Sequence, residues 1–240
     1  LDVAAMTANL LEKNNEMAAS GRGTPLTKQE MALTFVSAIG HDLDHEGKGN
    51  NVGVDPMGNE RKSYAIMEPL LREAGMTPAQ LSDVHTILMT TSPNGPHSIL
   101  KAMARAEREG TPITVEEIQL SERAAMTAKG TDFSNAPPMR VFTELQSLEG
   151  NPRLVQMAAM VSDADLYASG GAGMKANMVM SQLLTAEGQK YMGSKLDFTT
   201  DGSRMFFLDG IVGKEGFASA AGRDVANEQF KAMRAETTDR

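Results

Sequence analysis

Two histidines, two aspartates and one glutamate lie within six consecutive residues of the segment AIGHDLDHEGKGNN, which spans 38–51. The residues just before them, 31–40, carry no charge. Imidazole nitrogens and carboxylate oxygens are the usual cysteine-free ligands of zinc, and carboxylates with water bind magnesium or manganese. The cluster therefore favours a metal site at the end of an apolar helix. A polar helix end without metal is the alternative.

A helix over 28–45 would direct part of this cluster to one side. At about 100° per residue, His41, Asp42 and His45 fall within an arc of about 100°, whereas Asp44 points outside it. Because the preceding residues are uncharged, we expect this helix to be buried nearly all round. The side that leads to His41 carries small residues, which leave room for another group: Thr34, Ser37 and Ala38.

A second carboxylate comes from an expected helix over 152–168. Asp165 shares one face of this helix with three apolar residues, all within about 40°: Leu154, Ala158 and Val161. We therefore expect Asp165 to be buried, whereas Asp163 points about 160° away and should lie nearer solvent. A buried aspartate needs a strong partner. A metal shared with the first cluster would supply one, and hydrogen bonds from amides at a helix end are the alternative.

Composition limits the chemistry further. The chain of 240 residues has no cysteine, so thiolate catalysis, disulfides and sulfur-ligated metals are excluded, and zinc, magnesium or manganese is expected. A net charge of −8 disfavours binding to nucleic acid or anionic membranes, but a bound metal ion can still attract an anionic small substrate. Without a long apolar run, we expect a cytoplasmic protein with no membrane span. The chain begins at Leu1, so a targeting segment upstream stays open.

The remaining sequence reads as successive helices, since strand-favouring alternation is nearly missing. Capping boxes mark helix starts at Thr27, Thr77 and Thr114. We expect a single all-α domain over 1–240, with Pro69 kinking or ending the third helix. The expected helices are 2–19, 28–45, 61–74, 78–90, 98–108, 115–128, 138–148, 152–168, 173–192, 203–212 and 222–236.

HDLDHEGKGNN resembles the HD-x-D-H-x-G-x-x-N signature of the class I 3′,5′-cyclic-nucleotide phosphodiesterases, within the wider HD superfamily of metal-dependent phosphohydrolases. DADL at 163–166 resembles the distal metal motif of that family and selects Asp165, as the helical stripe does. Other segments resemble the family in the same order: LDVAAMTANLL at 1–11, SYAIMEPLL at 63–71, TTSPNGPH at 90–97 and KEGF at 214–217.

The resemblance implies a compact multi-helix HD-type fold with two divalent metal ions, zinc plus magnesium or manganese. His41, Asp42 and Asp165 would hold the first ion, and Asp42 would bridge to the second. A metal-bridging hydroxide would attack phosphorus, with Asp42 and His45 at the catalytic centre. Two further residues would hold metal-bound water: Asn50 and Glu68. The family's fourth ligand, a histidine, would lie two residues before Leu1, so the chain would be truncated relative to the family motif.

The sequence differs from the family at positions that would contact the base of a nucleotide. Lys214 stands at the position of a purine-contacting glutamine and Ala168 at that of an asparagine, while Phe217 retains the ring that would stack on a base. The resemblance thus implies hydrolysis of a small phosphodiester, such as a cyclic nucleotide, with altered base recognition. Alternatives are a nucleotide phosphomonoesterase of the same fold and a non-catalytic domain that senses metal or nucleotide. The oligomeric state stays open.

Overall fold

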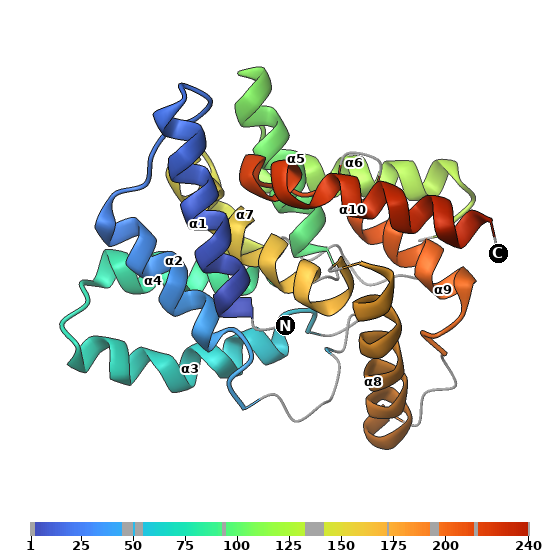
Figure 1. Cartoon of the computed structure of the whole chain (residues 1–240). Helices are drawn as coiled ribbons and strands as arrows, with labels where there is room; N and C mark the ends of the chain where they lie inside the picture. The colour runs from blue at the N-terminus through green and yellow to red at the C-terminus, as the bar shows by residue number, and fades with distance from the viewer. Residues whose placement is uncertain are drawn as a thin grey trace.

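Every regular element in the described part of the chain is helical, which confirms the predicted all-α class (Figure 1). The computed structural model describes residues 3–44, 50, 55–92, 95–132, 142–171, 173–192, 197–213 and 216–239. The α-helices in these ranges are α1 (Val3–Ala19), α2 (Lys28–Gly40), α3 (Gly58–Glu73), α4 (Pro78–Met89), α5 (Pro96–Glu109), α6 (Val115–Ala128), α7 (Pro152–Leu166), α8 (Met174–Met192), α9 (Asp201–Met205) and α10 (Ala220–Thr238). Three further segments have helical hydrogen-bond patterns other than the α pattern. They are the 3₁₀ helix η1 (Thr143–Leu148) and the π-helices η2 (Tyr167–Gly171) and η3 (Phe206–Val212).

The predicted capping boxes form and start three helices. In each, a threonine side chain accepts a hydrogen bond from the backbone N–H three residues later, and the acidic or amide side chain there accepts from the threonine N–H. These reciprocal bonds satisfy amides that have no partner within the helix. They begin α2, α4 and α6 at Thr27, Thr77 and Thr114.

Helix ends differ more from the prediction. α2 stops at Gly40 rather than at 45, and a turn follows in which Asp44 has φ of 58°. This left-handed conformation cannot continue a right-handed helix. Pro69 neither ends α3 nor lies at its terminus, since the helix continues to Glu73. Pro69 lies on the exposed side, where water can hydrate the carbonyl group that loses its N–H partner.

The predicted helix at 138–148 appears only as η1, and its first residues lie outside the described ones. Likewise, the end of the predicted helix at 152–168 belongs to the π-helical η2. The predicted helix at 203–212 divides into α9 and η3. Helical propensity does not distinguish these hydrogen-bond patterns, so the sequence indicated the segments but not their geometry.

α7 forms the centre of the structure. It packs against α1, α2, α4, α5 and α10, and its apolar residues are almost all fully buried (Figure 1). The main core gathers apolar side chains from α1 to α7, and Leu10, Leu88 and Leu100 are among its fully buried members. α7 therefore presents side chains to several helices at once.

A second core cluster lies at the C-terminal end of the chain, between α10, η3 and the end of α7. Phe217, Phe230 and Leu208 belong to it, and Tyr167 packs against both clusters. α8 extends away from this region in Figure 1 and exposes Val179 and Leu183. No helix among the described residues has the length and apolar character needed to cross a membrane.

Candidate metal centre

The packing of α2 against α7 brings the predicted metal ligands together. On α2, Thr34, Ser37 and Ala38 form the buried side that leads to His41, as predicted. The expectation of burial all round is wrong, because Phe35 and Ile39 on the opposite side are exposed. The small residues thus face the protein interior, where α2 meets α1, α4 and α7.

His41 lies directly after α2 and faces two carboxylates. Its Nε2 atom is 3.1 Å from Asp42 Oδ2 and 3.6 Å from Asp165 Oδ1. The His41 side chain is buried, Asp165 is mostly covered and Asp42 is largely exposed. The structure therefore joins all three residues that the sequence proposed as ligands, at a place that solvent can reach through Asp42.

The orientation of His41 is fixed by its other ring nitrogen. Nδ1 lies 2.8 Å from the carbonyl oxygen of Ala38, which can only accept a hydrogen bond, so Nδ1 carries a proton. Nε2 is buried and makes no hydrogen bond of acceptable geometry, despite its closeness to the carboxylates. In a neutral ring Nε2 would direct its lone pair at two carboxylates, an arrangement that requires a positive charge between them.

The pKa of His41 also indicates that a positive charge is favoured beside its Nε2 atom. Burial lowers the pKa of His41, but the interactions with the nearby carboxylates of Asp165 and Asp42 outweigh burial and raise it to about 10. Two carboxylates at one ring nitrogen therefore stabilise a positive charge, which a second proton or a divalent cation can supply.

The donor set fits a metal ion of the zinc, magnesium or manganese type. Two ligands bound to one zinc ion at about 2.1 Å lie roughly 3–3.5 Å apart, close to both distances measured from Nε2. The bond from Nδ1 to a backbone carbonyl is the usual support of a ligating histidine. As the side chains stand, no group of three or more acidic or histidine residues in the described part of the chain could hold a metal ion. A cation here would therefore draw the carboxylates inward and take its remaining ligands from water.

Glu60 is a carboxylate of this site that the sequence did not reveal. It is buried in the first turn of α3, and Asn50 Nδ2 donates to its two oxygens at 2.8 and 3.2 Å. Burial raises the pKa of Glu60 to about 7, Asn50 opposes the shift, and the negative charges of Asp42 and Asp165 add to it. Asn50 therefore acts on the site through Glu60, and Asn50 Oδ1 accepts from the Asn59 N–H at 2.8 Å.

The role predicted for Glu68 stays a prediction, and in the structure this residue has another partner. Glu68 lies two turns further along α3, where it forms an ion pair with Arg72 at 2.5 Å beside Tyr64 and His85. The helical stripe of α3 contained the missing signal, because its buried residues recur at helical spacing and include one acid: Glu60, Ser63, Met67 and Leu71. The reasoning that selected Asp165 on α7 would have selected Glu60 on α3.

Of the two aspartates of α7, Asp165 is mostly covered, as expected, but the prediction that Asp163 lies nearer solvent is wrong. Asp163 is 1% exposed, and its carboxylate accepts hydrogen bonds from the Ala218 and Ser219 N–H groups at 2.8 and 2.7 Å. The side of α7 that we expected to face solvent is covered by the start of α10. Binding to helix-end amides, considered as an alternative for Asp165, therefore applies to Asp163.

The residues predicted to read a base are not arranged for that purpose. Phe217 is 2% exposed and packs edge-on against Phe230 with ring centroids 4.9 Å apart, so it offers no accessible face for stacking. Ala168 is also buried. This corrects the prediction of a base-stacking ring at Phe217. His45 and Lys214 lie outside the described residues, so the roles predicted for them stay predictions.

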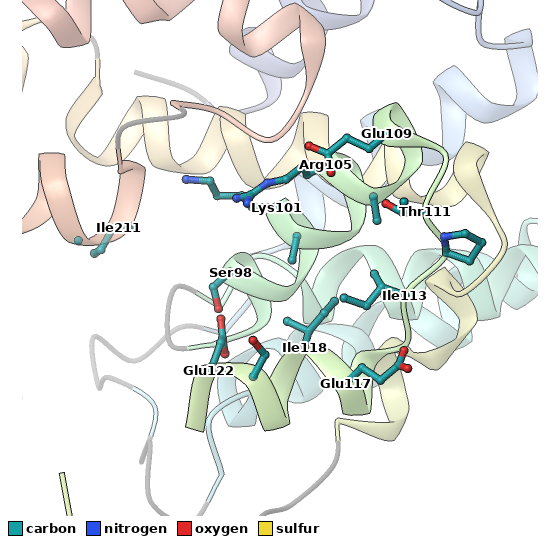
Figure 2. A pocket seen from close by; sticks show the side chains of 15 residues that line it. Ser98, Lys101, Arg105, Glu109, Thr111, Ile113, Glu117, Ile118, Glu122 and Ile211 are labelled. Atoms are coloured by element: carbon teal, nitrogen blue, oxygen red, sulfur yellow. The ribbon is translucent and has the colours of Figure 1, made fainter. Parts of the chain in front are cut away.

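A large cavity of about 740 Å³ lies elsewhere, between α5, α6 and η3 (Figure 2). Lys101 and Arg105 on α5 line one side, and Glu117 and Glu122 on α6 line the other. None of the predicted site residues lines it. The candidate metal centre is thus a partly exposed cluster separate from this cavity.

Comparison with known proteins adds no relative to this description. No protein-family model matches the chain, and no curated protein is significantly similar to it. The resemblance to the phosphodiesterases therefore rests on short motifs, and the functional argument depends on the geometry around His41.

Proposed function

We propose that the chain is a metal-dependent phosphohydrolase that cleaves a small phosphodiester, with His41, Asp42 and Asp165 as metal ligands. The observation that carries the proposal is the buried Nε2 of His41, which faces two carboxylates while Nδ1 is bound to a backbone carbonyl. The HD motif and the matching DADL segment support the choice of phosphate chemistry, since the same three residues are ligands in the family that the motifs resemble.

Divalent cations bound at such a site polarise a phosphate group and activate water. The chain's own part is to hold the donor atoms. The Ala38 carbonyl fixes the ring of His41, α7 carries Asp165 to it, and Asn50 holds the carboxylate of Glu60 nearby. Because Phe217 is buried in the core, the proposal includes no selection among nucleoside bases. The substrate class is defined by its phosphodiester group alone.

Metal content and hydrolysis should be measured together on three proteins: the unaltered chain, Asp165→Asn and Asp44→Asn. Asp44 is a matched control because it is an exposed carboxylate of the same turn, and asparagine tolerates its positive φ. After dialysis against manganese or zinc, mass spectrometry should find bound metal in the unaltered chain and in Asp44→Asn. Asp165→Asn should bind metal at least about 100-fold more weakly, because even supporting residues outside the ligand set cost 10–100-fold.

Hydrolysis of bis(p-nitrophenyl) phosphate, cyclic AMP and p-nitrophenyl phosphate should then follow the metal content. Metal at 100 times its dissociation constant should also stabilise the unaltered fold by about 2.7 kcal/mol in thermal denaturation. Absence of metal in the unaltered chain would mean that His41 carries a second proton and forms an ion pair. Metal binding without turnover would favour the sensing domain, and turnover of the monoester alone would favour a phosphomonoesterase.

A further inference from the structure

A second cavity, of about 290 Å³, lies between the end of α1, the end of α5, the first half of α7 and the start of α10. Its charged lining consists of three arginines, Arg22, Arg108 and Arg223, and one glutamate, Glu107, so its formal charge is +2. The whole chain has a net charge of −8. The candidate metal ligands do not line this cavity. It is a local basic site in an acidic protein.

The arginines come from three different elements, and two of them donate to backbone carbonyls. Arg223 Nη1 donates to the carbonyl oxygens of Phe217 and Ala218 at 2.9 and 2.6 Å. Arg108 Nη1 donates to the Ala104 carbonyl of its own helix at 3.1 Å. Each guanidinium has five N–H donors in a fixed plane, so an anchored edge sets the direction of the others. Arg223 is therefore the most firmly fixed of the three, whereas Arg22 and Arg108 are exposed side chains.

Two aspartates offset part of the positive charge. Asp224 lies 3.6 Å from Arg22 Nη1 and also forms an ion pair with Lys13 at 2.9 Å. The buried Asp163 interacts electrostatically with Arg223. In contrast, the cavity in Figure 2 has Lys101 and Arg105 opposed by three glutamates, Glu109, Glu117 and Glu122, and shows no excess of positive charge.

α7 forms part of the remaining wall. Val155, Ala159 and Met160 of α7 lie behind it, but they are only 3%, 1% and 0% exposed and offer little surface to a ligand. Gln156 is held beside them, since its Nε2 donates to Asn14 Oδ1 at 2.7 Å and to the Thr24 carbonyl at 3.1 Å. The guanidinium groups therefore define the ligand, and they fit an anionic group such as a phosphate.

We propose that this cavity binds the phosphate or phosphonate group of a small molecule, with its oxygens at Arg108 and Arg223. Guanidinium groups match the oxygens of such dianions in bidentate pairs. The volume is at the lower end of the range for ligand sites, about 300 Å³, which suits one ring with one anionic group. The proposal does not depend on metal binding or hydrolysis at the site of His41.

Calorimetric titration of the full chain with phenylphosphonate, in low-salt buffer containing EDTA, tests the proposal. Phenylphosphonate has no ester bond, so hydrolysis cannot remove it. Arg108→Gln should weaken binding about tenfold, the loss expected for one charge-assisted contact. Arg105→Gln is the matched control, because it removes an arginine of the same helix that lines the other cavity, and its affinity should stay within about twofold. Glu107→Gln should tighten binding.

The proposal would be overturned by no heat of binding at millimolar phenylphosphonate, by equal losses in Arg105→Gln and Arg108→Gln, or by equal affinity for benzyl alcohol, which lacks the anion. Phenylphosphonate binding to Asp165→Asn distinguishes the arginine-lined cavity from the candidate metal centre. Unchanged phenylphosphonate affinity in that variant supports an independent cavity, even if the metal proposal fails. Loss of binding in that variant would place the ligand at the metal centre and refute the second site.

Discussion

Glu30 and Arg153 link the two helices that carry the candidate ligands. Arg153 Nε on α7 donates to Glu30 Oε1 at 2.8 Å, and Arg153 Nη2 donates to Oε2. The same Oε2 accepts from the N–H and hydroxyl of Thr27 at 2.7 and 2.8 Å, which completes the capping box of α2. The link joins the first turns of α2 and α7, whose far ends bring His41 and Asp165 together.

Glu30→Gln removes the charge of this link but keeps a side chain that can cap the helix. Arg153 is the largest cause that lowers the pKa of Glu30, from an ordinary 4.5 to about 2, while burial opposes the shift. At about 1.4 kcal/mol per pKa unit, this shift corresponds to at most about 3.5 kcal/mol. Solvent reaches both side chains, so screening reduces the expected loss in Glu30→Gln to about 1–2 kcal/mol.

Glu117→Gln supplies the matched control. Glu117 forms the same capping box with Thr114 at the start of α6, where the N–H and hydroxyl of Thr114 both donate to Oε2 at 2.8 Å. The hydrogen bonds from Thr114 are the causes that lower the pKa of Glu117, and no arginine contributes. Urea denaturation followed by circular dichroism should therefore show a clear loss for Glu30→Gln and a much smaller one for Glu117→Gln.

The pH dependence has a defined sign. Because the folded pKa of Glu30 is lowered, its stabilisation is fully present above the unfolded value near 4.5 and is lost as pH falls toward about 2. The difference between the unaltered chain and Glu30→Gln should accordingly be largest near pH 7 and shrink to less than half by pH 3. An equal cost for the two glutamate variants, or a gap that stays constant down to pH 3, would refute the role of Arg153.

Two glycine substitutions test close approaches of the backbone. In urea denaturation, Gly222→Ala should lower the free energy of unfolding by about 1–3 kcal/mol, because its Cβ would lie 2.5 Å from Asp163 Oδ2. Gly23→Ala is the control and should have little effect, because no atom lies within 4 Å of its Cβ. Gly40→Ala should destabilise by overpacking, since its Cβ would lie 1.9 Å from Met67 Sδ. In a double-mutant cycle, Gly40→Ala and Met67→Ala should cost less together than the sum of their separate losses, and simple additivity would contradict the contact.

Helix starts were predictable because their chemistry is local. A threonine and a glutamate or glutamine three residues apart satisfy each other's backbone amides wherever they occur, and all three predicted capping boxes formed. Helix ends depend on less local conditions. The sequence did not predict the positive φ of Asp44, because a helix that ends in this conformation usually has glycine or asparagine there.

The aspartates of α7 show where a single-helix pattern fails. The prediction from the apolar stripe around Asp165 assumed that α7 has one apolar side and one solvent-facing side, but α7 packs against other helices on several sides. Asp163 is buried because the start of α10 supplies two N–H donors, and α10 is more than fifty residues later in the sequence. Phe217 was misread for a related reason, since a motif match does not indicate whether a ring faces a ligand or Phe230.

The candidate site also depends on a third helix, and Gly40 explains how it fits. Any Cβ at this last residue of α2 would collide with Met67, which shares the buried face of α3 with Glu60 and Ser63. Ser63 Oγ donates to the Leu43 carbonyl at 2.9 Å, so this face lies against the turn that follows His41. Gly40 therefore leaves room for the Met67 side chain, and Glu60 on the same face of α3 lies within electrostatic range of Asp42 and Asp165. Glu68, the acid that the motif indicated, follows Met67 on the same helix and forms an ion pair with Arg72.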